Sequence, residues 1–481
     1  QGCIEVPPLH VAPSCHIKPT MVPRVHVGAA HGPRDPAMSK AAMKYLLVRP
    51  KVPAPLDPNF CPVVLAKKRY MKLLGGSPFT LEWAMPRAEG CCARGKLPVL
   101  ADSHPDLDAS VHLAGVKTMP KVCGTPSEPF PVKIVASASE LPPAKDKKQV
   151  CGKDASGCRL AFDLGKSDIK TVAVQDNEVL ESMETEWDVT NPDPEYHWDL
   201  ILGAMKKTAA KLPRVDAIGG SATGTVSGNS EATWCDIFPN VPPDIYQEKV
   251  VNIFHRLAKE FGDVPLKVIN DGEVTALAGM MMVKKGKLLG ISMGSSEGGG
   301  YCDEDGNLLG WINELCYIQL DMNPEAPCDP WTPHSGMSHM YLGQRAATRL
   351  AERGGVDLPE ELLPSAPGMN TMSHEGHAKC LKLVQSAMKD PASEPKVREI
   401  YETIGVYLGY ALAQCSEHYA IDNALVLGRV STGAGGQIML EKAKEVLMAE
   451  FPEYGHIEFH QPDEHFKRVG QCIAAAALPE L

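Results

Sequence analysis

The pattern of hydrophobic and polar positions changes near residue 150. Beyond it, short apolar runs that end in glycine or acidic residues alternate with longer stretches in which apolar residues recur every three or four positions. The first pattern predicts strands and the second predicts helices. Strands are expected at 159–165, 170–185 (as a meander turning near 176–177), 214–224, 266–270, 287–294, 299–310 and 424–428. Helices are expected at 193–212, 242–261, 271–283, 395–420 and 437–451. This alternation predicts an α/β fold with mixed sheets.

The region before residue 150 has a different texture. It holds 22 of the 41 prolines and shows weak periodicity. Prolines interrupt helices and confine strands to short lengths, so we expect a small, proline-rich N-terminal domain of unknown type. The predicted organisation is an extended arm, an N-terminal module, a linker and two topologically similar halves that meet at a cleft, with bounds at 1–40, 41–137, 138–150, 151–290 and 291–481.

Composition excludes several classes of function. The net charge of −11 argues against nucleic acid as the main partner, and no apolar run approaches the ~20 residues of a membrane-spanning helix. The 15 cysteines are scattered, which favours free thiols in a reducing compartment, either the cytoplasm or an organelle interior. Because the chain starts at Gln1 without a signal pattern, a processed or incomplete N-terminus is also compatible with the sequence.

The segment AFDLGKSDIK places Asp163 at the end of a predicted strand, before a tight turn. A carboxylate there can hold a magnesium ion through water, while the turn amides face phosphates. We therefore assign Asp163, Gly165, Lys166 and Ser167 to cofactor binding, with Lys166 as a cation able to reach a phosphate. A plain hairpin that happens to contain an aspartate is the alternative.

The segment KVINDGEVTALAG passes from an apolar strand into a helix. Ligands of open α/β sheets bind at the carboxyl ends of the strands, where Asp271 is expected. Such a carboxylate can accept a proton from a hydroxyl while Asn270 orients the acceptor. The alternative is that Asp271 serves only to cap the helix, a position where aspartate is favoured.

Two further glycine-rich turns follow apolar strands. MGSSEGGG suits phosphates, with Glu297 as an unusual acidic member, and ALVLGRVSTGAGG suits a nucleotide base or ribose. A simple hairpin loop is the alternative for the first. The cofactor-binding residues predicted here are Gly294, Ser295, Ser296, Gly298, Gly299, Gly428, Thr432 and Gly433.

The order and spacing of these four segments resembles the sugar kinase/actin/Hsp70 superfamily and, within it, the ROK family of sugar kinases and repressors. The resemblance covers roughly residues 155–478 and implies two ribonuclease-H-like, actin-like ATPase halves around a cleft. It implies that Asp271 is the catalytic base, that Glu314 binds sugar hydroxyls, and that the loop containing Ser221 and Gly224 borders the sugar. ATP and Mg²⁺ are the cofactors it implies, and homodimers occur among relatives. Tyr317 stands where the family has a zinc-binding histidine, so no zinc is expected.

The leading hypothesis is an ATP-dependent kinase that phosphorylates a hexose-type sugar. Lys166 and Glu297 depart from the family pattern and leave a second hypothesis open. In that alternative, a catalytically degenerate member acts as a ligand sensor or assembly subunit, and its N-terminal region binds a protein partner. A third, weaker hypothesis is an ATPase of the same superfamily.

Overall fold

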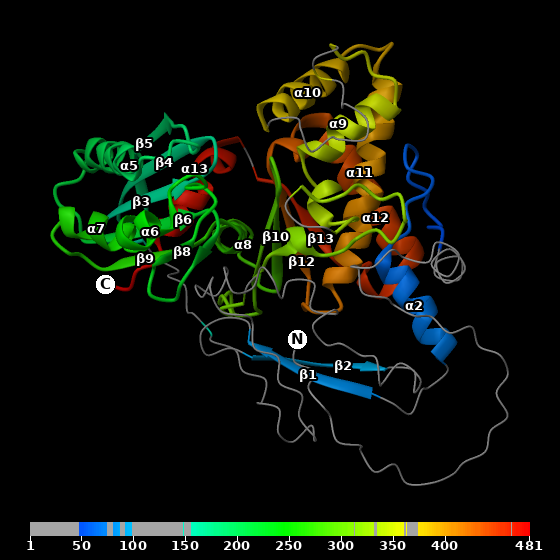
Figure 1. Cartoon of the computed structure of the whole chain (residues 1–481), viewed down its shortest axis with the longest axis horizontal. Helices are drawn as coiled ribbons and strands as arrows, with labels where there is room; N and C mark the ends of the chain where they lie inside the picture. Colours follow the sequence, from blue (N-terminus) through cyan, green and yellow to red (C-terminus); the bar gives the residue numbers. More distant parts are fainter. Residues whose placement is uncertain are drawn as a thin grey trace, which may run out of the picture. The chain divides into compact units, whose positions relative to one another are not determined.

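The computed structural model describes residues 48–74, 80–86, 92–98, 148, 155–311, 313–330, 334–359, 362, 374–462 and 464–481 (Figure 1). The parts of the predicted arm and linker that fall elsewhere lie outside the described residues. None of the helices in the described ranges is both long and apolar enough to cross a bilayer. The cysteines whose side chains the structure describes are free thiols.

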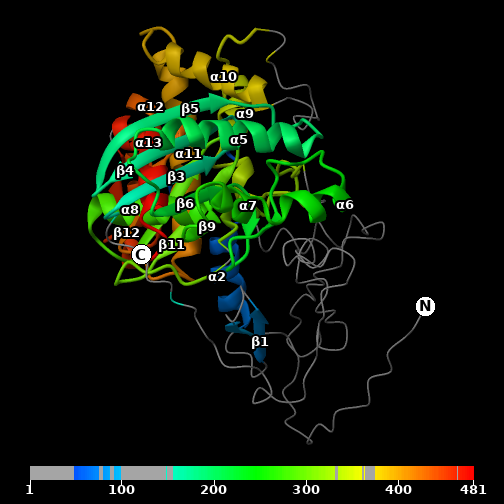
Figure 2. The same cartoon turned by 90° about the vertical axis from the view of Figure 1, so that its left-hand side faces the viewer.

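The first lobe is built on a five-stranded sheet in the order β5-β4-β3-β6-β9 (Figure 2). Strands β3 to β5 form the predicted antiparallel meander, whereas β6 and β9 run parallel to β3. The turn between β4 and β5 lies at Asp176 and Asn177, whose φ angles of 50° and 70° suit a tight two-residue hairpin. The strands are β3 (Cys158–Leu164), β4 (Asp168–Gln175), β5 (Glu178–Glu186), β6 (Ala217–Ala222) and β9 (Leu266–Asn270).

Helices cover both faces of this sheet, and its central strand is therefore buried on both sides. Leu160, Phe162 and Leu164 of β3 pack with helices α5 (Pro194–Ala209) and α7 (Ile253–Glu260). Ala161 faces the opposite way, toward helix α13 (Glu464–Ala476). This alternation follows from the two-residue period of a strand.

The helix predicted at 242–261 is not continuous, so this prediction is partly wrong. The segment contains a helical turn, α6 (Pro243–Ile245), a π-helical turn, η3 (Tyr246–Val250), and then α7. The carbonyl of Val251 accepts a hydrogen bond from the amide of Ala232, in strand β8 (Ala232–Trp234), at 2.9 Å. This sheet contact coincides with the break between η3 and α7.

The second lobe contains a four-stranded sheet in the order β11-β10-β12-β13. As in the first sheet, the first strands in sequence are antiparallel; here they are β10 and β11. The later strands, β12 and β13, run parallel to β10 and lie on the side of β10 away from β11. The prediction of two ribonuclease-H-like halves is therefore confirmed. The strands are β10 (Leu288–Met293), β11 (Glu297–Cys302), β12 (Asn423–Leu427) and β13 (Glu458–His460).

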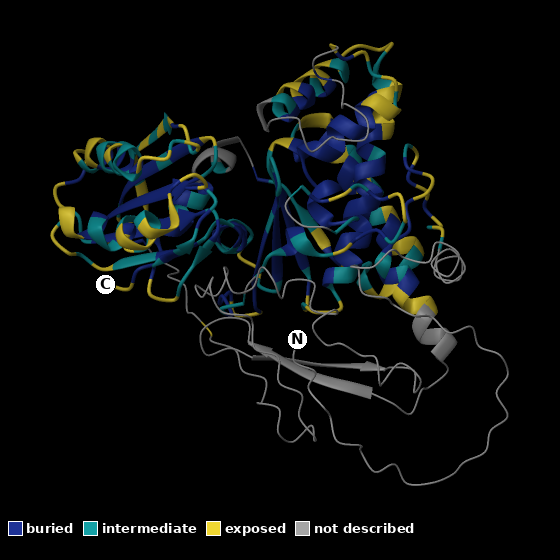
Figure 3. Cartoon of the chain, in the orientation of Figure 1, coloured by how far each residue is buried: buried dark blue, intermediate teal, exposed yellow. Residues whose placement is uncertain are grey.

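Long helices bury the outer face of the second sheet (Figure 3). The 22-residue helix α11 has 15 buried residues, which include three tyrosines, so it is enclosed on most sides. The helices of this lobe are α9 (Gln344–Arg353), α10 (His374–Ala387), α11 (Glu394–Cys415) and α12 (Gly433–Glu450). The shorter turns are η4 (Leu315–Tyr317), η5 (Ser338–Met340), η8 (Arg429–Ser431) and η9 (Pro452–Tyr454).

Two helices form a layer between the sheets. Helix α8 (Asp271–Val283) and α13 share one apolar cluster with residues of both sheets, among them Ala161 of β3 and Leu288 of β10. A Cβ on Gly219 of β6 would lie 1.8 Å from the carbonyl oxygen of Ala475, so α13 packs directly on the first sheet. Our predicted second half, 291–481, includes this helix, although its contacts are with the first lobe.

Part of the sequence that we assigned to an N-terminal module packs on the second lobe. Phe60 is buried against the rings of Tyr341 and Tyr407, and the Asp57 carboxylate accepts a hydrogen bond from the Tyr407 hydroxyl at 2.6 Å. Residues 52–64 thus contribute to the core of that lobe. They lead into helix α2 (Val63–Leu74), which is followed by the antiparallel pair β1 (Thr80–Pro86) and β2 (Cys92–Pro98).

Candidate functional site

Asp271 lies where strand β9 becomes helix α8. Asn270 caps this helix, because its side-chain oxygen accepts a hydrogen bond from the Gly272 amide at 2.7 Å. The Asn270 amide nitrogen donates to the Gly224 carbonyl at 2.7 Å. Asn270 therefore occupies the capping position that we considered for Asp271. The Asp271 carboxylate also accepts a hydrogen bond from the Gly272 amide, at 3.0 Å, and one from the hydroxyl of Thr223 in the neighbouring loop, at 3.1 Å.

Three other carboxylates lie close enough to Asp271 to affect its ionisation. Burial is the main reason that the pKa of Asp271 rises to about 7, and the negative charges of Asp163, Glu314 and Asp236 raise it further. The Thr223 hydroxyl opposes this rise. Asp163 and Asp236 come from the first lobe and Glu314 from the second, so the two lobes jointly build an acidic centre around Asp271.

Close contacts at two glycines hold the segment that contains Glu314 against the start of α8. A Cβ on Gly299 of strand β11 would lie 2.2 Å from the side chain of Leu315, the residue after Glu314. A Cβ on Gly272 would lie 2.1 Å from the Gly299 carbonyl oxygen. We expected Gly299 to bring backbone toward phosphates, but the space beside it is filled by Leu315 and the start of α8.

The turn after Glu314 is buried and internally bonded. The Cys316 thiol donates to the Glu314 carboxylate at 3.4 Å, and burial raises the pKa of Glu314. The ring of Tyr317 contacts the ring of the fully buried His339. The His339 Nε2 atom lies 3.1 Å from a carboxylate oxygen of Asp329. In the described part of the chain, no group of three or more His, Cys, Asp or Glu residues is arranged to hold a metal ion.

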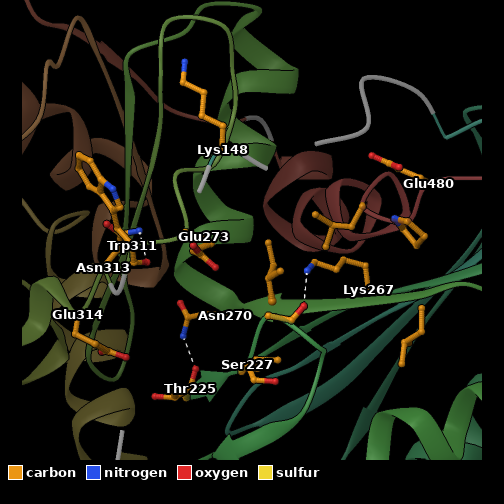
Figure 4. A pocket seen from close by; sticks show the side chains of 18 of the residues that line it. Lys148, Thr225, Ser227, Lys267, Asn270, Glu273, Trp311, Asn313, Glu314 and Glu480 are labelled. Atoms are coloured by element: carbon orange, nitrogen blue, oxygen red, sulfur yellow. Dashed lines mark hydrogen bonds between the residues drawn. The ribbon is translucent and has the colours of Figure 1, made fainter. Parts of the chain in front are cut away.

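A cavity of about 620 Å³ lies beside this centre and receives residues from both lobes (Figure 4). Figure 4 shows Glu314 directed from the second lobe toward Asn270 of the first. Gly224 also lines the cavity, at the start of the small hairpin β7 (Thr225–Val226) and β8. Three of the four predicted acceptor-binding residues are therefore together. The fourth, Ser221, is fully buried in β6, where it pairs in register with Asp163 and does not line the cavity.

The first predicted phosphate turn is the β3–β4 hairpin. Asp163 is 5% exposed, and burial raises the pKa of its carboxyl, against the opposing charge of Lys170 at 3.9 Å. At the tip, Ser167 is exposed and the Gly165 amide donates to the Asp168 carbonyl at 3.1 Å. The Lys166 ammonium lies 2.6 Å from the Asp236 carboxylate.

The second predicted phosphate turn joins β10 to β11 and rests on the start of helix α9. The Gly294 carbonyl accepts from the Gln344 amide at 2.9 Å, and the Ser295 carbonyl accepts from the buried Arg345 guanidinium at 3.3 Å. The Gly294 amide in turn donates to the Ser296 carbonyl at 2.9 Å. These bonds fix the shape of the turn.

Glu297 does not project into this turn. It is 6% exposed, one of its carboxyl oxygens has no hydrogen-bond partner among the described residues, and burial raises its pKa to about 7. The side chain faces the Ser338 hydroxyl and lies near Cys415, inside the second lobe. The residue that appeared incompatible with anions is therefore a core residue. Its neighbour Gly298 has room for a side chain, because the described atom nearest to a Cβ there would be in Ser292, at 3.8 Å.

The third turn follows β12. Gly428 has a φ of 101°, and a Cβ on it would lie 2.4 Å from the Met293 carbonyl oxygen, so this turn contacts the second one. Thr432 precedes α12, and its hydroxyl donates to the Arg429 carbonyl at 2.9 Å. Gly433, the first residue of α12, has a φ of 69°, and a Cβ on it would meet no atom of the described residues within 4 Å. The space beside the Cα atom of Gly433 is therefore open.

Sequence reasoning missed three residues at this centre. Asp236 follows the very short strand β8, in a stretch without a recognisable pattern. Arg345 lies in α9, a helix that we did not predict, and is buried against the second predicted phosphate turn. Thr223 could have been found, because it precedes Gly224 in a loop that we had singled out.

No protein-family model and no curated protein matches this sequence. Solved structures do match. One is a ROK family glucokinase from Streptomyces griseus, in complex with glucose and AMPPNP, at 18% identity over 66% of this chain and 98% of the glucokinase, with a TM-score of 0.50. Another is a ROK family transcriptional regulator, a homologue of the E. coli MLC protein, at 18% identity over 67% of this chain and 78% of the regulator, with a TM-score of 0.51. The chain therefore has the fold of ROK proteins, as its sequence motifs predicted, and this fold serves both a sugar kinase and a regulator.

Proposed function

We propose that the protein transfers a phosphoryl group from ATP to a hydroxyl of a sugar, with a hexose-type acceptor. The observation that carries this proposal is the position of Asp271. Its carboxylate lies at the carboxyl end of β9, next to the residues of a two-lobed cavity and next to Asp163 at the first glycine turn. A base at this position would lie between the bound acceptor and the phosphate donor.

The acceptor side of the proposal uses the cavity. Asn270 and Glu314 supply an amide and a carboxylate, the groups that recognise sugar hydroxyls, and the Gly224 backbone closes one wall. The raised pKa of Asp271 suits a general base, since a base works best when its pKa is near the working pH. Asp271 would accept the hydroxyl proton while Asn270 and Glu314 hold the acceptor.

The nucleotide side fits the residues that are present. ATP supplies the phosphoryl group and Mg²⁺ neutralises charge on it. Asp163 would hold the ion through water, and the turn containing Gly294 to Ser296 would face the phosphates. The open space beside Gly433, at the start of an 18-residue helix without a side-chain cap, suits the adenosine part, because the first amides of a helix have no acceptor within the helix. Lys166 would contribute its charge to the phosphates.

Replacement of Asp271 by asparagine tests the assignment of the base. Turnover of a sugar panel, followed as ADP release, should fall by ~10²–10⁴-fold, the usual contribution of a general base. Calorimetry should show that binding of Mg·AMPPNP persists. Asp199→Asn, on the exposed face of α5, is the matched control and should keep full activity. Full activity in Asp271→Asn would show that this carboxylate is not the base.

One observation favours a second function, a ligand sensor or assembly subunit that does not turn over ATP. Lys166 is already paired with Asp236, at the hairpin where phosphates would bind. In that role the N-terminal region would contact a protein partner or a second copy of the chain. Calorimetry with ATP and Mg²⁺ separates the two functions, because absence of binding at millimolar nucleotide supports the sensor.

A further inference from the structure

The ion pair between Lys166 and Asp236 joins two parts of the first lobe that are far apart in sequence. Lys166 is at the tip of the β3–β4 hairpin, three residues after Asp163. Asp236 follows β8, in the segment after the cavity-lining hairpin. Their charged atoms are 2.6 Å apart, which is a short, direct contact. The pair therefore connects the predicted phosphate side of the site to its acceptor side.

The surroundings of this pair place it at the centre of the site. The charge of Asp236 acts on both Asp271 and Glu314, and the charge of Lys166 acts on Glu314. The other charged groups that act on Asp271 are Asp163 and Glu314, and both are negative. Lys166 is thus a cation held among carboxylates, at a point where the proposed reaction brings in a polyanion.

We propose that Asp236 is a positioning residue. In the nucleotide-free protein it holds Lys166 beside the catalytic centre, and nucleotide phosphate then replaces Asp236 as the partner of the lysine. This inference rests on the proposed function and extends it with a role for a residue outside the phosphate turns. In the nucleotide-free protein, Asp236 neutralises the charge of a lysine that lies among hydroxyl-binding groups. In the complex, Lys166 binds the phosphates and the Asp236 carboxylate is free to accept a hydrogen bond.

The exposure of the two side chains permits this exchange. Lys166 is 22% exposed and Asp236 is 32% exposed, so water reaches both and the pair is not locked in a dry interior. A lysine side chain has several rotatable bonds and can turn from one anion to another. A triphosphate carries more negative charge than one carboxylate and therefore competes well for the same ammonium group.

A double-mutant cycle tests the exchange with Mg·AMPPNP as the probe, measured by calorimetry on the full chain. Lys166→Met should weaken binding by about tenfold or more, because a phosphate contact is lost. Asp236→Asn should tighten binding several-fold, because nucleotide no longer has to displace the carboxylate. In the Lys166→Met background, Asp236→Asn should have no further effect, since there is no cation to release.

The controls separate this mechanism from simpler ones. Lys206→Met removes a lysine from an exposed ion pair with Glu260 on the outside of the lobe and should not change binding. Equal tightening by Asp236→Asn with lysine or methionine at 166 would overturn the inference, because Asp236 would then act only as a general repulsive charge. No change in either single variant would also overturn it, and the pair would be purely structural.

The result also distinguishes this inference from the proposed function. A wild-type chain that binds Mg·AMPPNP but gives an additive cycle contradicts only the role of Asp236. A wild-type chain that binds no Mg·AMPPNP at millimolar concentration contradicts both the kinase proposal and the positioning role of Asp236. Thermal unfolding of each variant, expected within a few degrees of wild type, ensures that the binding data refer to folded protein.

Discussion

Gly272 and Gly299 touch through their backbones, since a Cβ on Gly272 would lie 2.1 Å from the Gly299 carbonyl oxygen. The contact is reciprocal, because a Cβ on Gly300 would lie 2.2 Å from the Gly272 carbonyl oxygen. Gly272 follows Asp271 directly, and Gly299 and Gly300 belong to β11, the strand that follows the second predicted phosphate turn. The position of the proposed base relative to the second lobe is therefore set by glycines that admit no side chain.

Gly300→Ala should disturb this contact. The added methyl group would meet backbone atoms of Gly272 and Glu273, which cannot rotate away, so the start of α8 must shift. Overpacking of this kind typically lowers the free energy of unfolding by about 1–3 kcal/mol. We expect a lower melting temperature and a larger fractional loss of kcat than of nucleotide binding.

Gly298→Ala is the matched control, because it lies two residues away in the same strand. The described atom nearest to its Cβ would be in Ser292, at 3.8 Å, which is an ordinary van der Waals contact. Chemical denaturation should give a free energy of unfolding close to that of the wild type. Equal damage from the two substitutions would show that the strand tolerates no side chain for a reason unrelated to α8.

The activity should depend on pH through Asp271. A general base must be ionised to accept a proton, and the pKa of this carboxyl is about 7. The rate at limiting acceptor concentration should therefore fall about tenfold for each pH unit below that value. Asp236→Asn removes one of the charges that raise this pKa, so the acid limb should move to lower pH.

The pH dependence that we assign to Asp271 must be distinguished from titration of Glu273. Burial raises its pKa to about 7 as well, and it lies half a turn after Asp271 on α8. In Glu273→Gln the acid limb should persist, whatever the level of activity. If the limb disappears in that variant and remains in Asp236→Asn at its original position, Glu273 is the titrating group.

The strands and turns of this fold could be predicted because their signals are local. Asp176 and Asn177 indicate a hairpin turn by residue type, and Leu160, Phe162 and Leu164 indicate a buried strand by alternation. Asp271 could be placed at a strand end for the same reason. Such features depend on residues that are close in sequence, so a single sequence is enough to predict them.

Other features depend on distant contacts and could not be predicted. The break in the helix at 242–261 coincides with a hydrogen bond between Val251 and Ala232, and the pairing of Lys166 with Asp236 joins two separate loops. Glu297 was interpreted as an unusual acidic member of the second glycine-rich turn. Its burial depends on the packing of α11 and η5, which no local pattern records.

The buried carboxyl of Glu297 should make the stability of the protein depend on pH. Its pKa is raised from an ordinary value of 4.5 to about 7, so the folded state binds this proton more tightly than the unfolded state. The stabilisation is complete below about pH 4.5 and is lost as pH rises through about 7. Glu297→Gln should raise the free energy of unfolding at pH 8 by up to about 3 kcal/mol and should have little effect near pH 4.5.

Urea denaturation at several pH values measures this effect. The difference between wild type and Glu297→Gln should grow steadily from pH 5 to pH 7 and then level off. Glu325→Gln, an exposed residue of the same lobe, is the comparison and should give a difference that does not vary with pH. A constant difference for Glu297→Gln would mean that this carboxyl has an ordinary pKa.

His339 should hold in position the turn that follows Glu314, the proposed acceptor-binding residue. Its ring is fully buried, lies 3.1 Å from Asp329 through Nε2 and contacts Tyr317, which is three residues after Glu314.

His339→Ala removes a partner of a buried carboxylate and leaves a cavity, so a loss of about 3–5 kcal/mol of stability is expected. His339→Gln keeps a side chain able to donate to Asp329 and should recover part of that loss. In His339→Gln, the KM for the acceptor should rise while the KM for ATP stays unchanged, because the turn that holds Glu314 rests on this ring. Equal increases in both KM values would instead indicate a general loosening of the second lobe.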